Sequence, residues 1–358
     1  MASLLLVPLL VLFSSTALHV TSSPSQSAST VMASSDAACP SDVEIELFPF
    51  IRVYKNGSIE RLKGTDTVPA SFDAATGVAS KDVTIDPANG LSVRLYLPPA
   101  ASAGGAKKLP VLVYVHGGGF MVQSAAFPTY HRYVNALSAR AGAIAVSAEY
   151  RRVPEHPLPA AYDDSWAALA WAVDACAAGP GGSEPWLAAH GDASRVFLAG
   201  DSAGANIAHN VALRAASEGL PLQPGAAIAG VMLVHPFFWD PSNTMAPELE
   251  VRIRREWAFT CARPDADVDD PRICPTSAGA SARLAAMPCG RVMVAVAEDD
   301  FLAAKGRAYH AALVASGWRG EAELVDTPGQ GHVFHLRRPG TEAAAEMLDR
   351  VADFISGA

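Results

Sequence analysis

Residues 195–213 read RVFLAGDSAGANIAHNVAL, and no other segment says more about the fold. Its first six residues are typical of a buried strand, and the residues after Gly204 are typical of a helix. Between them, Gly200-Asp201-Ser202-Ala203-Gly204 matches G-x-S-x-G, which sets a serine on a sharp turn. Glycine suits the two flanking positions because side chains there would clash with neighbouring elements. The string alone is a weak signal, since such a serine also fits a helix N-cap.

A second glycine motif supports the first. His116-Gly117-Gly118-Gly119 follows directly on the apolar strand LPVLVYV. The chain's own histidine and glycine frequencies make this string a chance event in roughly one such chain in 200. Its glycines let backbone N–H groups face one point, where a carbonyl oxygen that becomes negative is bound. We predict an oxyanion hole formed by the N–H groups of Gly118, Gly119 and Ala203, and the alternative is a plain glycine-rich turn.

A serine hydroxyl near neutral pH needs a base to remove its proton, and the base needs a carboxylate to fix its tautomer. The strand RVMVAVAE precedes Asp299 and Asp300, and the strand EAELVD precedes His332. Both loops follow strands, at the sheet edge where Ser202 lies. We predict Ser202 as nucleophile, His332 as base and Asp300 as acid. Asp299 is the competing acid, because adjacent side chains point in different directions.

The remaining pattern predicts an α/β fold with one mostly parallel central sheet and helices on both faces. We expect a single domain over residues 42–358, with a cap from about residues 42–75 and 236–288. The second of these segments breaks the strand–helix alternation and carries no clear strand. Apolar side chains near the glycine turn and this insertion fit either the core or an acyl pocket. They are Phe120, Met121, Phe237, Phe238 and Trp239.

Composition excludes several partner classes. The chain has 358 residues, of which half are hydrophobic and 18% are charged, so it can bury a large core. Its net charge of −9 repels a phosphate backbone and provides no basic patch for anionic lipid. We therefore expect a small-molecule partner and no nucleic acid. Because no apolar run reaches the roughly 20 residues that cross a bilayer, we expect no integral membrane environment either. The sequence does not fix the oligomeric state.

The N-terminus resembles a secretory signal peptide over residues 1–22, followed by a disordered linker over residues 23–41. Its apolar run, Leu4–Phe13, is too short to cross a bilayer. This predicts the secretory pathway or the cell exterior. No Lys or Arg precedes Arg52, so a hydrophobic tail on a cytoplasmic protein is the alternative, and a plastid transit peptide ranks third. Asn56-Gly57-Ser58 is a glycosylation sequon, but Asn-Gly first indicates a hairpin turn.

The cysteines and histidines show no metal-ligand spacing. The five cysteines are too few and too scattered for a disulfide framework, and we expect mostly buried thiols. If the chain is secreted, one bridge is possible and one thiol stays unpaired. We expect no metal and no cofactor. The cysteines are Cys39, Cys176, Cys261, Cys274 and Cys289.

The motifs together resemble a family. HGGGF, YRRVPEHPLPAAYDDSW, GDSAGAN, an Asp-x-Leu at Asp300 and a His-x-Phe-His at His332 occur in this order. They resemble the hormone-sensitive-lipase-like α/β-hydrolases, specifically the plant carboxylesterases, from about Glu44 to the C-terminus. The stretch FPFIRVYKNGSIERL looks like the plant branch, whose N-terminal segment helps to cap the active site. The resemblance implies this fold and the triad given above.

The resemblance is less specific for the substrate. The family includes esterases of small aryl, alkyl and secondary-metabolite esters, a 2-hydroxyisoflavanone dehydratase and the non-hydrolytic gibberellin receptor. The receptor branch lacks the catalytic histidine and has serine at the third glycine, whereas this chain has His332 and Gly119. The dehydratase branch carries threonine where this chain has Ser202. These features favour a serine carboxylesterase that works through an acyl-enzyme, with a dehydratase or lyase and a gibberellin-receptor-like binding protein as alternatives.

Overall fold

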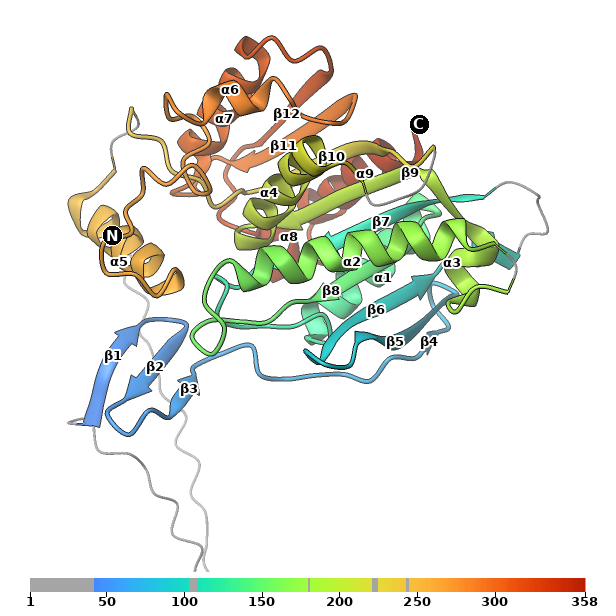
Figure 1. Ribbon diagram of the computed structural model, residues 1–358, viewed down its shortest axis with the longest axis horizontal. Coiled ribbons are helices and arrows are strands. Elements are labelled where there is room, and N and C mark those ends of the chain that lie inside the picture. The colour runs from blue at the N-terminus through green and yellow to red at the C-terminus, as the bar shows by residue number, and fades with distance from the viewer. Residues whose placement is uncertain (1–41, 103–107, 180, 221–224, 243–244, 358) are drawn as a thin grey trace, which may run out of the picture. The chain divides into compact units, whose positions relative to one another are not determined.

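The fold is built on a large mixed sheet. In the computed structural model, which describes residues 42–102, 108–179, 181–220, 225–242 and 245–357, nine strands form this sheet in the order β12-β11-β10-β9-β7-β8-β6-β5-β4. Neighbours from β12 to β8 run parallel, and β6, β5 and β4 are antiparallel (Figure 1). The strands are β4 (Phe72–Asp73), β5 (Val78–Asp86), β6 (Leu91–Leu97), β7 (Leu109–Val115), β8 (Ile144–Glu149), β9 (Gly191–Asp201), β10 (Ile228–Val234), β11 (Arg291–Ala297) and β12 (Glu321–Thr327).

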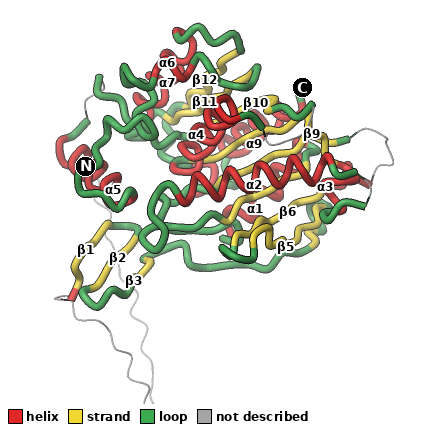
Figure 2. Tube along the Cα trace, in the orientation of Figure 1, coloured by secondary structure: helices red, strands yellow, loops and turns green. Residues whose placement is uncertain are grey.

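Helices cover both faces of this sheet because the central strands are apolar on both faces. In β7, Val111 and Val113 join one buried cluster, and Leu112 and Tyr114 join the other. Helices α2, α4 and α7 pack on the first face, and α1, α8 and α9 pack on the second (Figure 2). The helices are α1 (Pro128–Ala141), α2 (Ala160–Ala177), α3 (Pro185–His190), α4 (Ala203–Glu218), α5 (Pro247–Thr260), α6 (Ser281–Leu284), α7 (Ala303–Ala315), α8 (Phe334–Arg337), α9 (Glu342–Ser356) and the 3₁₀ helix η2 (Pro99–Ser102).

A small antiparallel sheet precedes the large one. It contains β1 (Val43–Leu47), β2 (Ile51–Tyr54) and β3 (Ile59–Arg61). The turn between β2 and β3 holds Asn56, whose Oδ1 accepts the backbone N–H of Ser58 at 2.9 Å, and Gly57 has a φ of 82°. The hairpin predicted from Asn-Gly is therefore confirmed, and the glycan on Asn56 stays a prediction.

The parallel sheet with helices on both faces confirms the predicted fold class. The insertion at residues 236–288 holds no strand in its described part, as expected, but it contains the helix α5, which the sequence analysis did not predict. Pro247 begins this helix and Glu248 lies in its first turn, where acidic groups suit the helix dipole. Ion pairs between residues four apart along the helix join Arg252 to Glu256 and Arg254 to Glu250. Pro247 and Glu248 are ordinary helix-start signals.

The predicted signal peptide, the linker and Cys39 lie outside the described residues. The four remaining cysteines are free and buried, as expected for structural thiols, and no bridge joins any of them within the described chain. Burial raises the pKa of Cys176 and of Cys289 to about 12. No helix in the described part of the chain has the length and hydropathy needed to span a membrane.

Candidate active site

The site lies where the strand order reverses. The chain passes from β7 to β8 on one side and later places β9 on the other side of β7, so the loops after β7 and β9 are neighbours. In open α/β sheets, ligands bind at such a reversal, beyond the carboxyl ends of the strands. The loop after β7 carries the glycine motif, and the turn after β9 carries Ser202.

Ser202 occupies a strained turn. Its backbone has φ 54° and ψ −120°, a conformation that a residue other than glycine rarely adopts. The turn is tight because β9 enters α4 directly. A Cβ at Gly200 would collide with the backbone of Gly204, and a Cβ at Gly204 would collide with the carbonyl oxygen of Val115 in β7. The expected need for glycine on both sides of Ser202 is therefore confirmed.

Three side chains from distant segments form one hydrogen-bonded chain. Nε2 of His332 lies 2.9 Å from Oγ of Ser202, and its Nδ1 lies 2.7 Å from Oδ2 of Asp300. The Asp300 side chain is fully buried and that of His332 is 17% exposed. An ionised carboxylate only accepts, so Nδ1 carries the proton and Nε2 is left to accept the hydroxyl of Ser202. The structure thus brings together the three residues that the sequence selected.

The two adjacent aspartates have different surroundings. Burial pushes the pKa of Asp300 upward, but its hydrogen bond to His332 and the charge of that histidine outweigh burial, so the pKa is lowered. Its Oδ1 also accepts the backbone N–H of Leu302 at 3.0 Å. Asp299 is exposed, and its backbone N–H donates to the carbonyl of Gln330. Only Asp300 contacts the histidine.

The glycine turn offers unused donors beside the serine. Gly118 has φ 104° and Gly119 has φ 63°, and both line the same cavity as Ser202. Ala203 begins α4, so its N–H has no acceptor within the helix. Within the described residues, the N–H groups of these three residues donate to no protein group.

Asp201 joins the two loops, and the sequence analysis did not identify this role. The hydroxyl of Tyr114 donates to its Oδ1 and that of Tyr130 to its Oδ2, both at 2.8 Å. The Tyr130 hydroxyl also accepts the N–H of Gly117 at 2.8 Å. Burial raises the pKa of Asp201 to about 6, although both hydroxyl bonds oppose the rise. Asp201 therefore links the serine turn to the glycine turn and to α1.

Known proteins match this chain and this geometry. A family profile described as alpha/beta hydrolase fold matches residues 112–336. Probable carboxylesterase 13 of Arabidopsis thaliana is 44% identical over 328 residues, which are 88% of this chain and 99% of that protein. Tuliposide A-converting enzyme 1, chloroplastic, of Tulipa gesneriana is 45% identical over 93% of this chain and 83% of its own length.

The chain belongs to the α/β-hydrolase family and, within it, to the plant carboxylesterases.

Solved esterase structures agree with this membership. The thermophilic carboxylesterase EstE1 from a metagenomic library is 27% identical, with a TM-score of 0.61 over 81% of this chain and 90% of that chain. The esterase of Pyrobaculum calidifontis is 26% identical, with a TM-score of 0.59 over 78% of this chain and 85% of that chain. The predicted resemblance is confirmed, and this chain is a carboxylesterase-family hydrolase.

The cavity at Ser202 shows that the predicted set of acyl-pocket residues is mostly wrong. It measures about 610 Å³, and of the five proposed pocket residues only Phe237 lines it. The other four are buried in the core, where Phe120 packs edge-on against Tyr162 and Phe238 packs against His209. Apolar lining comes instead from Phe50, Phe127, Phe301, Val333 and Leu336. The four core residues are Phe120, Met121, Phe238 and Trp239.

His235 positions the loop that carries His332. Its Nδ1 accepts the backbone N–H of Val333 at 2.8 Å, and Val333 has a φ of 48°. Burial lowers the pKa of His235 to about 3, so it is neutral and able to accept. His235, Asp300 and His332 offer ligand atoms within 4.8 Å of one another. Their contacts to protein groups fit a hydrogen-bonded chain, and we assign no metal to them.

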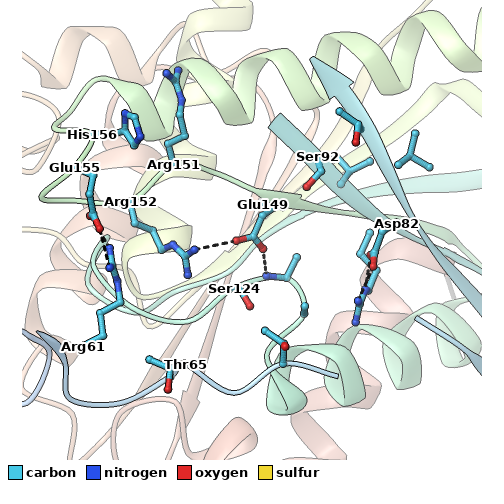
Figure 3. A pocket seen from close by; sticks show the side chains of 18 residues that line it. Arg61, Thr65, Asp82, Ser92, Ser124, Glu149, Arg151, Arg152, Glu155 and His156 are labelled. Carbon is cyan, nitrogen blue, oxygen red and sulfur yellow. Dashed lines mark hydrogen bonds and ion pairs between the residues drawn. The ribbon is translucent and has the colours of Figure 1, made fainter. Parts of the chain in front are cut away.

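A second cavity, of about 670 Å³, lies beside the loop after β8, and most of the residues that line it are polar or charged (Figure 3). Figure 3 shows Arg61 of β3 facing Glu155, and two hydrogen bonds of 2.9 and 2.7 Å join them. Nε of Arg61 also donates to the carbonyl of Met121, just after the glycine turn. These contacts tie the N-terminal segment of the hydrolase to the loops around the site.

Proposed function

We propose that this chain is a serine carboxylesterase that hydrolyses small carboxylic esters through an acyl-enzyme. Ser202 attacks the ester carbonyl while His332 takes its proton, and Asp300 stabilises the imidazolium that forms. His332 then returns the proton to the leaving alcohol. Water, activated by the same histidine, releases the acid and restores the serine. The hydrogen-bonded chain Ser202–His332–Asp300 is the observation that carries this proposal.

The oxyanion in this scheme is bound by backbone groups. The N–H groups of Gly118, Gly119 and Ala203 stabilise the negative oxygen that develops on the carbonyl. Their lack of another protein acceptor within the described residues supports this role. The scheme uses no metal and no cofactor.

The decisive test is Ser202→Ala assayed with para-nitrophenyl butyrate. Removing the nucleophile of such a triad costs roughly 10⁶-fold in turnover. We expect hydrolysis to fall to the level of the oxyanion hole and binding alone. A fluorophosphonate should label the unaltered protein once, at Ser202. Normal hydrolysis by Ser202→Ala would refute the proposal, and an unlabelled, inactive protein would favour the receptor-like alternative.

A lyase or dehydratase reaction at the same site is the second candidate. The names of the tulip relatives describe a converting enzyme rather than an esterase, at 44 to 45% identity. Hydrolysis consumes water, so reaction in ¹⁸O-labelled water places the label in the acid product. An unlabelled product would favour the second candidate.

We also propose that residues 42–75 and 236–288 cap the site. Phe50 and Lys63 come from the first segment and Phe237 and Arg252 from the second, and all four line the cavity at Ser202. Asn206 of α4 holds the second segment, because its side-chain nitrogen donates to the carbonyls of Phe237 and Arg272 at 3.0 and 2.8 Å. Substrate size would thus depend on both segments.

The proposed localisation depends on residues 1–41. The signal-peptide pattern favours secretion, whereas the names of two tulip relatives include chloroplastic and amyloplastic. We propose the secretory route and treat plastid import as the competing outcome. Residues 1–41 fused to a fluorescent protein in leaf cells should label the secretory pathway, and fluorescence in plastids would overturn this choice.

A further inference from the structure

Positive side chains gather at the mouth of the Ser202 cavity. Lys63, Arg132, Arg252 and Arg337 all line this cavity, and all four reach solvent. They come from four separate places: the segment after β3, then α1, α5 and α8. The chain as a whole carries a net charge of −9, so this gathering runs against its average charge.

The carboxylates that line the same cavity leave most of this charge uncompensated. Glu256 pairs with Arg252 at 2.6 Å. Asp201 is buried and accepts two tyrosine hydroxyls. Within the described residues, the other three cations form no ion pair, although Lys63 lies 4.7 Å above the ring of Phe50. The mouth therefore presents three cations without an acidic partner.

Three of these cations, Lys63, Arg252 and Arg337, are close enough to affect one another. Partial burial lowers the pKa of Lys63, and the charges of Arg337 and Arg252 lower it further, with Glu256 opposing them. Like charges gathered at a cleft raise the local concentration of a ligand of opposite charge. An anion at the mouth would relieve this repulsion.

The apolar walls and the serine of the cavity indicate the uncharged part of the ligand. Phe50, Phe237 and Phe301 give it apolar walls, and Ser202 lies within it. A cavity of about 610 Å³ holds one small molecule. The matching ligand has an ester at the serine, an apolar body and a negative group that reaches the mouth.

We infer that Lys63, Arg132 and Arg337, with Arg252, select esters that carry a second, anionic group such as a carboxylate, sulfate or phosphate. This inference rests on the esterase function proposed above. The anionic group lies on either the acyl or the alcohol side of the ester, and the test includes both.

The experiment compares matched esters. In the acyl pair, para-nitrophenyl hemisuccinate is compared with para-nitrophenyl butyrate. In the alcohol pair, para-acetoxybenzoate is compared with phenyl acetate. The readout is the ratio of kcat/KM for the anionic ester to that for the neutral ester, so a general loss of activity cancels. The ratio is measured for the unaltered protein and for the double variant Lys63→Met/Arg337→Gln.

We expect the double variant to lower the ratio roughly three- to tenfold in at least one pair, since an exposed charge pair contributes modestly. Raising the salt from about 0.01 M to about 1 M should reduce the ratio of the unaltered protein, because screening acts on exposed charges. Arg319→Gln is the matched control. It removes one exposed charge two residues before the amino end of β12, whereas the cavity lies beyond the carboxyl ends of the strands, so the ratio should stay unchanged.

The outcomes separate this inference from the proposed function. A ratio that the double variant and salt leave unchanged in both pairs would overturn the inference, while Ser202-dependent hydrolysis of the neutral esters would still stand. Activity that survives Ser202→Ala would overturn the proposed function itself. If the double variant fails to fold, Lys63→Arg/Arg337→Lys keeps both charges and should keep the ratio. If this charge-conserving variant lowers the ratio of kcat/KM, the preference for anionic esters does not depend on charge, and the inference is wrong.

Discussion

At the scale of single residues, direct hydrogen bonds decide which side chains belong to the candidate catalytic triad. Asp299 and Asp300 are neighbours in the sequence, but only Asp300 turns into the interior and reaches His332. The lowered pKa of Asp300 keeps it ionised at neutral pH, which a group that orients an imidazole requires. The backbone of Ser202 is strained, and in this conformation its hydroxyl points at the imidazole of His332.

The two aspartates provide a matched prediction. Asp300→Asn keeps the shape of the side chain but removes the charge and can hold the wrong tautomer of His332. We expect kcat to fall about 10⁴-fold. Asp299→Asn alters an exposed side chain, and activity should stay close to that of the unaltered protein. Hydrolysis of para-nitrophenyl butyrate measures both, and a larger loss in Asp299→Asn would reverse the assignment.

At the scale of elements, close backbone contact holds the serine turn. α4 starts against β7, and Gly204 leaves no room for a side chain beside Val115. Gly204→Ala should lower the free energy of unfolding by roughly 3 kcal/mol or more, because a rigid backbone cannot yield to the added methyl group. Gly279→Ala is the control, since a Cβ there meets no atom within 4 Å. Urea unfolding compares the two, and equal stabilities would contradict the close packing.

The N-terminal segment gives a second prediction at this scale. Arg61 joins β3 to Glu155 and to the carbonyl of Met121. Arg61→Met removes these bonds while keeping an apolar stem. Backbone amides of β2 and β3 should then exchange with deuterium faster, and KM for esters should rise if the segment caps the site. Hydrogen exchange with mass spectrometry measures the first effect, and unchanged protection would show that Arg61 does not hold the segment.

The sequence predicts elements with strong local patterns and misses what depends on distant contacts. Short, almost continuously apolar runs identify the central strands, and the two glycine motifs locate the site because sharp turns need glycine. The bond of Asp201 to Tyr130 spans 71 positions, and no local pattern signals it. The predicted set of pocket residues is wrong for a related reason. Phe120 and Phe237 are both aromatic and near the site, but only Phe237 faces the cavity.

At the scale of the whole molecule, several histidines are buried in the neutral form although the chain as a whole is acidic. The chain carries a net charge of −9, while the interior holds histidines on both faces of the sheet. Burial lowers the pKa of His116 and of His209 to about 3, and it lowers the pKa of His335 far below its usual value. None of these three is needed as a base in the proposed reaction. All three should lower the stability of the protein in acid, because each takes up a proton when the protein unfolds.

His209 shows this consequence most simply. It is fully buried, and its Nδ1 lies 3.0 Å from the hydroxyl of Tyr309. Its pKa is about 3 in the folded protein and about 6.5 in the unfolded chain, so unfolding takes up a proton between these values. The stabilisation is complete above pH 6.5 and is lost as the pH falls toward 3. His209→Gln removes this proton uptake while Gln still offers an acceptor to Tyr309.

Between pH 7 and pH 5, the unaltered protein should therefore lose roughly 2 kcal/mol more unfolding free energy than His209→Gln does. Tyr309→Phe is the matched control. It removes the hydrogen bond but leaves the imidazole buried, so it should be less stable at every pH and keep the pH dependence of the unaltered protein. Urea unfolding at several pH values measures all three proteins. Parallel curves for His209→Gln and the unaltered protein would show that His209 takes up no proton on unfolding, and the acid sensitivity would then belong to the other buried histidines.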